Sequence, residues 1–109
     1  MNQIAQRISP AEAFKLIQLN PDLTIVDLRR PEEIVGGRIE KSIALDFDAG
    51  VFSRRVDALP RERTYLIYCH SSVRSAKALA IMRSLGFQSV YEIGGGMEAW
   101  TAAGLPIVV

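Results

Sequence analysis

Short apolar runs that suit buried strands alternate with helix-like segments along almost the whole chain, and this alternation restricts the fold more than any other feature. The clearest strand-like runs are residues 23–26, 65–68 and 89–91, which are rich in β-branched and aromatic side chains. Strands that alternate with helices predict an α/β fold, with a mostly parallel sheet covered by helices on both faces.

Local signals predict where several helices begin and end. Ser9-Pro10-Ala11-Glu12 reads as a capping box with proline at the first helical position, and Asn20-Pro21 ends that helix. The clearest helix covers residues 76–85 and stops at Gly86. Weaker candidates are short helices at 31–35, 51–59 and 97–103, and a strand at 42–45.

Length and composition predict one domain, residues 1–109, with 49% hydrophobic residues to build its core. The net charge of +1 gives no reason to expect nucleic acid or an anionic membrane as partner. No apolar run approaches the roughly 20 residues that span a bilayer, and residues 1–8 show no signal peptide. We therefore expect a soluble, cytoplasmic protein. One cysteine and one histidine offer neither an internal disulfide nor a convincing metal site, so we expect no metal.

The single cysteine, Cys69, stands between the strand-like run 65–68 and the helix-like segment that follows. Residues 69–75 read Cys-His-Ser-Ser-Val-Arg-Ser. Backbone N–H groups of such a turn and the start of the next helix stabilise an anion, which lowers the pKa of a thiol and favours a nucleophilic thiolate. A lone cysteine is more often a small core residue. The polar neighbours are poor chemistry for a core, so the nucleophile is the better interpretation.

Asp27 and Arg29 follow the strand-like run 23–26, just as Cys69 follows 65–68. Ligands of open parallel sheets bind outside the carboxyl ends of the strands, so these three residues are expected at one edge. Asp27 and Glu33 also suit a bracing role, through hydrogen bonds to the backbone or to an arginine. For Arg29, lining a pocket and pairing with Glu33 are equally consistent with the sequence.

Six short motifs occur in an order and at a spacing that resemble the rhodanese-like (sulfurtransferase) domain family, from about residue 9 to residue 108. Each motif alone is weak, and the match comes from the set. They are Asp27-x-Arg29-x-x-x-Glu33, Gly37-Arg38-Ile39, the Cys69 to Arg74 loop with Ser75, Leu85-Gly86-Phe87, Ile93-x-Gly95-Gly96-x-x-x-Trp100 and Gly104-x-Pro106.

The resemblance implies a five-stranded, mostly parallel α/β domain whose cysteine takes a sulfane sulfur from a donor and holds it as a persulfide. Cys69 would be the nucleophile and carrier, with no cofactor beyond this covalent intermediate. Arg74 would bind the donor's anionic group or stabilise the loop. Ser72 stands where the family commonly has glycine, and a side chain there disfavours a positive φ. The residues that would shape the sulfur cradle are His70, Ser71, Ser72, Val73 and Ser75.

The acceptor must come from outside, because the chain has no second thiol to resolve a persulfide on Cys69. The expected partners are a small sulfur donor, such as thiosulfate or a persulfide, and a cyanide or thiol acceptor; a protein donor or acceptor is also open. Two other functions compete. Rhodanese-like cysteine phosphatases use Cys-x5-Arg, whereas four residues separate Cys69 from Arg74, and a shorter loop favours a single sulfur atom. A non-catalytic interaction module would not need both Cys69 and Arg74.

Overall fold

Five parallel strands form one sheet in the order β1-β5-β4-β2-β3, which confirms the fold class predicted from the alternating pattern. The computed structural model describes residues 2–109. No helix in this part of the chain is long and apolar enough to cross a membrane. The elements in chain order are β1 (Ile4–Ile8), α1 (Pro10–Leu19), β2 (Thr24–Asp27), α2 (Pro31–Ile34), β3 (Ile43–Ala44), the 3-10 helix η1 (Phe47–Ala49), α3 (Phe52–Asp57), β4 (Thr64–Tyr68), α4 (Val73–Ser84), β5 (Ser89–Ile93) and α5 (Gly96–Ala102).

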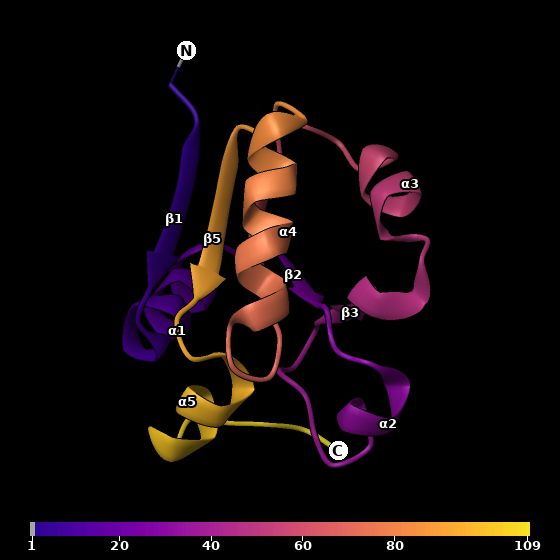
Figure 1. The fold of residues 1–109 in the computed structure, drawn as a ribbon. Coiled ribbons are helices and arrows are strands. Elements are labelled where there is room, and N and C mark those ends of the chain that lie inside the picture. Colours follow the sequence, from indigo (N-terminus) through magenta and orange to yellow (C-terminus); the bar gives the residue numbers. More distant parts are fainter. Residues whose placement is uncertain (1) are drawn as a thin grey trace.

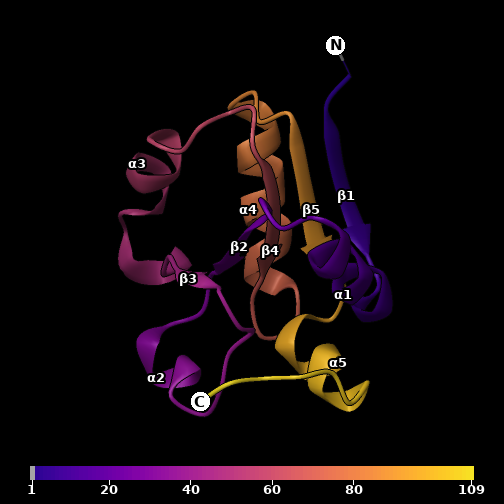
Figure 2. The same ribbon diagram turned by 180° about the vertical axis from the view of Figure 1, so that it is seen from behind.

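Helices cover both faces of the sheet, and each face has its own hydrophobic core. Helices α3 and α4 lie on one face (Figure 1). Their buried side chains, such as Val56 and Met82, belong to the core on that face. Helices α1 and α5 lie on the other face (Figure 2). They contribute Ala13 and Trp100 to its core. The central strand β4 is apolar along its length because both of its faces are buried.

All five strands run in the same direction, so their carboxyl ends meet at one edge of the sheet. The short helices α2 and α5 lie at this edge, together with the turn that leads from β4 into α4 (Figure 1). Cys69 is the first residue after β4. The topology therefore places the predicted nucleophile between two helices that come from distant parts of the sequence.

Several elements differ from the sequence prediction: the 3-10 helix η1 was not expected, β5 extends two residues beyond the predicted 89–91, and β1 and α4 differ as follows. Strand β1 was not predicted, because an edge strand that contains the polar pair Gln6 and Arg7 carries little hydrophobic signal and is held instead by its ladder with β5. Helix α4 begins at Val73, three residues before the predicted start, because Arg74 and Ser75 form its first turn. The predicted capping box of α1 is confirmed: Ser9 Oγ accepts from the Glu12 N–H at 3.1 Å, and Glu12 Oε1 accepts from the Ser9 N–H at 2.9 Å.

Candidate active site

The sulfur of Cys69 is buried and lies among hydrogen-bond donors of the turn that follows it. Its side chain is 1% exposed. Sγ accepts from the backbone N–H groups of Ser72 at 3.2 Å and Ser75 at 3.3 Å, and Ser75 Oγ lies 3.4 Å away. Burial by itself would raise the pKa of the Cys69 thiol, but its hydrogen bond with the Ser75 side chain and those from the backbone N–H groups of Ser75, Ser71 and Ser72 together lower it. The site therefore favours a thiolate, which is the nucleophilic form of cysteine.

Ser72 adopts the left-handed conformation that its side chain was expected to disfavour, with φ of +82°. Two hydrogen bonds of its hydroxyl accompany this conformation. Ser72 Oγ donates to the Ile93 carbonyl at 3.3 Å and accepts from the Gly95 N–H at 2.8 Å. These bonds tie the loop to the turn between β5 and α5 and offset the cost of the positive φ, which is about 1–2 kcal/mol for a residue with a side chain. The loop thus turns as it would with glycine.

Arg74 is held by a carboxylate from another element. Its Nη1 and Nη2 donate to the two carboxylate oxygens of Glu33 at 2.6 and 2.8 Å, and Asp48 lies 3.7 Å from Nη1. Of the two roles predicted for Arg74, this pair corresponds to stabilising the loop, because it joins the first turn of α4 to α2. The hydrogen bonds from Arg74 outweigh burial and lower the pKa of Glu33 from 4.5 to about 2.

Replacing Glu33 by glutamine should destabilise the protein in a pH-dependent way. The carboxylate's pKa is lower in the folded than in the unfolded protein, so its contribution is complete above pH 4.5 and is lost as the pH falls towards 2. Glu33→Gln should therefore lower the free energy of unfolding by on the order of 2 kcal/mol at neutral pH. Urea denaturation at several pH values measures this, with the exposed neighbour Glu32→Gln as the matched control. A constant difference between wild type and Glu33→Gln from neutral pH to pH 2 would contradict the pairing.

Asp27 and Arg29 form a buried ion pair beneath the site, with side chains 1% and 4% exposed. Asp27 Oδ1 and Oδ2 accept from Nε and Nη2 of Arg29 at 3.0 and 2.8 Å, and Tyr68 donates its hydroxyl proton to Oδ2 at 2.6 Å. Burial and the Asp27 charge raise the pKa of Tyr68. The carboxylate partner of Arg29 is Asp27; from Glu33 it receives only the backbone carbonyl, at 3.1 Å. The contacts match the bracing role.

The remaining predicted loop residues face outward. His70 is half exposed and lies 3.5 Å from Glu98, and Val73 is 65% exposed. Neither side chain is among those bonded to the sulfur. A cavity of about 380 Å³ beside His70 is lined by α2 and α5, and Arg29 contributes to its wall, as the pocket interpretation of that residue expected.

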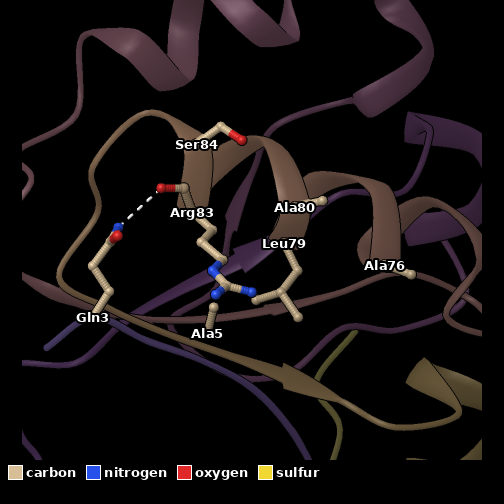
Figure 3. A pocket seen from close by; sticks show the side chains of 7 residues that line it. All are labelled: Gln3, Ala5, Ala76, Leu79, Ala80, Arg83 and Ser84. Atoms are coloured by element: carbon tan, nitrogen blue, oxygen red, sulfur yellow. Dashed lines mark hydrogen bonds between the residues drawn. The ribbon is translucent and has the colours of Figure 1, made fainter.

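A second cavity, of about 650 Å³, lies between β1 and α4 (Figure 3). There Gln3 reaches across to donate to the Arg83 carbonyl at 2.9 Å, and Ala76, Leu79 and Ala80 form the helix side. Its lining contains no residue of the loop 69–75. The cavity beside His70 is lined by one residue of that loop, although Cys69 itself lines neither cavity.

Two residues that the sequence reasoning missed lie behind the cysteine. Glu92 on β5 is 1% exposed, and its Oε2 accepts from Ser75 Oγ at 2.5 Å. Arg7 on β1 stands opposite Glu92 in the strand register and binds both of its oxygens, at 2.9 and 3.2 Å. The sequence does contain a signal for Glu92, because a glutamate at the end of a buried strand, directly before Ile93, is a candidate site residue. The predicted strand ended at residue 91, so this signal was not used.

Known proteins share both the sequence and the fold of this chain. The rhodanese-like domain model matches residues 9–103. A sulfurtransferase of Allochromatium vinosum is 37% identical over 80% of this chain and 79% of its own length, and the thiosulfate sulfurtransferase GlpE of Actinobacillus pleuropneumoniae is 27% identical over 98% and 96%. Two other relatives are longer, and the chain spans 46% and 26% of them.

Among solved structures, a rhodanese-related protein from Thermoplasma volcanium superposes with a TM-score of 0.83, at 27% identity over 94% of this chain and 97% of that one. Three observations indicate the same family: the five-stranded parallel sheet, the cysteine turn after the central strand and the matched family model. The chain belongs to the rhodanese-like domain family. Its relatives named as sulfurtransferases support an enzyme of the rhodanese type.

Proposed function

We propose that this protein is a sulfurtransferase that carries sulfane sulfur on Cys69 as a persulfide. The observation that supports this most directly is the sulfur itself, buried at a strand end among two N–H donors and a hydroxyl, with a lowered pKa. Donors arranged in advance around a developing or transferred negative charge lower the barrier of such a step. The same donors would support the terminal sulfur of a persulfide anion.

The chemistry takes two displacement steps. In the first, the Cys69 thiolate attacks the outer sulfur of a donor such as thiosulfate; a sulfur–sulfur bond forms at Cys69, the donor's sulfur–sulfur bond breaks, and sulfite leaves with the electron pair. In the second, a nucleophile such as cyanide or a thiol attacks the outer sulfur of the persulfide and regenerates the thiolate. Neither step needs a cofactor. The acceptor is external because Cys69 is the only cysteine of the sequence.

Thiosulfate and small persulfides are the donors that this proposal favours. A relative matched over nearly its whole length is named a thiosulfate sulfurtransferase. The cavity of about 380 Å³ beside His70 has room for a small donor or for the tip of a protein thiol. Since both Nη atoms of Arg74 already bind Glu33, we assign the recognition of the donor's charge to the loop N–H groups and keep Arg74 for shaping the loop. A free thiol of this kind is suited to the reducing cytoplasm.

Incubation with thiosulfate should add one sulfur atom to the wild-type protein and none to Cys69→Ser. The reason is that the serine hydroxyl has the shape of the thiol, with a smaller oxygen in place of sulfur, but does not form a persulfide. Intact-mass spectrometry reads the addition directly, and cyanide should then remove it as thiocyanate. Turnover by Cys69→Ser should stay below about one per cent of wild type, because the covalent carrier is missing.

Two results would contradict this proposal. One is the absence of any added sulfur from thiosulfate or a small persulfide while the thiol of Cys69 reacts with an alkylating agent. The other is equal sulfur addition to Cys69→Ser. Hydrolysis of a phosphate ester by wild type, lost in Cys69→Ser, would instead assign the loop to phosphate chemistry. Circular dichroism of both proteins checks that the substitution leaves the fold intact.

A further inference from the structure

Four side chains form a continuous line of polar contacts from the buried cysteine to the protein surface. Cys69 Sγ lies 3.4 Å from Ser75 Oγ, Ser75 Oγ lies 2.5 Å from Glu92 Oε2, and both oxygens of Glu92 bind Arg7. The first three residues are buried, whereas Arg7 is 53% exposed. The mechanism proposed above uses the first contact and leaves the buried carboxylate without a role.

The direction of the hydrogen bonds in this line follows from counting protons. A serine hydroxyl has a single proton, and an ionised carboxylate can only accept. Since Ser75 Oγ is 2.5 Å from Glu92 Oε2, its proton lies towards the carboxylate. Its lone pairs then face Cys69, so the thiol donates to Ser75. The line therefore runs from thiol to hydroxyl to carboxylate, which is the order needed to pass a proton from sulfur to Glu92.

We propose that Glu92 is the base that takes the proton of Cys69, with Ser75 as the relay between them. The sulfur–hydrogen bond breaks as that proton joins Ser75 Oγ, while the hydroxyl's original proton moves to Glu92 Oε2. A thiolate, a neutral serine and a neutral carboxylic acid result, and nothing is oxidised or reduced. When an acceptor removes the outer sulfur and the thiolate returns, the same path carries the proton back. This role rests on the proposed nucleophilic function of Cys69.

The groups that face Glu92 are one positive charge, one hydroxyl and apolar surface. The β1 neighbour, Arg7, supplies a positive charge through two hydrogen bonds. The β4 neighbour in the strand register is the apolar Ile67, and α4 offers the Ser75 hydroxyl. Burying a carboxylate costs several kcal/mol unless it is paired, and Arg7 supplies that pair. The pairing with Arg7 does not explain why Glu92 also makes a short contact with Ser75. That contact joins Glu92 to the residue that touches the sulfur of Cys69.

The relay predicts a specific pH dependence. Without an internal acceptor, a thiol loses its proton to water, and its reactivity falls tenfold for each pH unit below its pKa. With the relay, the pair of Cys69 and Glu92 holds one proton, and the fraction with that proton on Glu92 does not depend on pH until a second proton binds. The reactivity of Cys69 should therefore level off to a plateau on the acidic side of the pKa of its thiol.

The test is the rate of alkylation of Cys69 by iodoacetamide across the pH range in which each protein remains folded. Wild type should show the acidic plateau. Glu92→Gln keeps an oxygen for Ser75 to bond but cannot take a proton at acidic pH, so its rate should keep falling with unit slope. At the acidic end its rate, relative to its own alkaline limit, should be at least about tenfold below that of wild type. Ser75→Ala should lose the plateau and Ser75→Thr should keep it, whereas Glu62→Gln, an exposed carboxylate, should behave as wild type.

The slope separates the relay from a purely structural role. Losing the charge of Glu92 leaves Arg7 free to shift the pKa of the thiol, but such a shift moves the whole profile sideways and does not create or remove a plateau. Unit slope in wild type, or a plateau that survives in Glu92→Gln, would overturn the proposal. Both outcomes are readable even if thiosulfate fails to load sulfur, because alkylation needs only the thiol. Thermal unfolding of each variant confirms that folded protein was compared.

Discussion

Gly96→Ala should abolish sulfur transfer and destabilise the protein. Gly96 has φ of +60°, and a Cβ placed there would meet the backbone of the cysteine loop, at 2.6 Å from the His70 carbonyl oxygen and closer still to that of Cys69. Neither backbone atom can rotate away. We expect a loss of at least about 100-fold in rate, since displacing a reacting group by about 1 Å costs this much. The added strain should lower the free energy of unfolding by about 2–4 kcal/mol. Turnover with thiosulfate and cyanide, and urea denaturation, measure the two effects.

The reason for the expected loss of activity is the way α5 holds the loop. The N–H of Met97 donates to the Cys69 carbonyl at 2.8 Å, and that of Glu98 donates to the His70 carbonyl at 3.0 Å. Moving α5 outward to admit a methyl group would break both bonds. Gly104→Ala is the matched control, because Gly104 also has a positive φ, +72°, but has open space around it. If Gly104→Ala lost as much activity as Gly96→Ala, backbone strain rather than the close approach would be the cause.

The position of Cys69 at the end of a central strand could be predicted from the sequence because the signals for it are local. An apolar run, a thiol and a polar turn occupy consecutive residues, and the parallel topology then places Cys69 at the ligand-binding edge of the sheet. The turn itself was less predictable. A serine at position 72 suggested a different backbone, and the bonds that support its positive φ come from Ile93 and Gly95, more than 20 positions away.

The pairing of charges could not be predicted, since it depends on which strands become neighbours. Glu33 was expected to brace the fold through the backbone or an arginine, with Arg29 as the one named partner, and in the structure its arginine partner is Arg74. Glu92 and Arg7 meet because β1 and β5 are adjacent in the sheet, although 85 positions separate them. Strand β1 was not predicted, and Arg7 lies on it. Local sequence patterns therefore could not have placed Arg7 beside Glu92.

Asp27→Ala should be among the most destabilising single substitutions near the site. Asp27 accepts four hydrogen bonds: from the backbone N–H of Arg29, from two nitrogens of its guanidinium, and from the Tyr68 hydroxyl. Removing the carboxylate leaves the buried Arg29 charge without a counter-ion and the Tyr68 hydroxyl without its acceptor. Breaking a buried ion pair in this way costs about 3–5 kcal/mol. Urea denaturation of Asp27→Ala should show this loss as a lower midpoint with an unchanged slope.

The loss should reach the site as well, because Arg29 also donates to the carbonyls of Glu33 and Gly37 and so positions α2, which holds Arg74. Asp57→Asn provides the matched control: its carboxylate pairs with Arg61 but is 64% exposed, so its loss should cost less than about 1 kcal/mol. Equal effects of Asp27→Ala and Asp57→Asn would show that burial does not strengthen the Asp27 network. A fall in the stability of Asp27→Ala with no change in the alkylation rate of Cys69 would show that the network braces the sheet without reaching the loop.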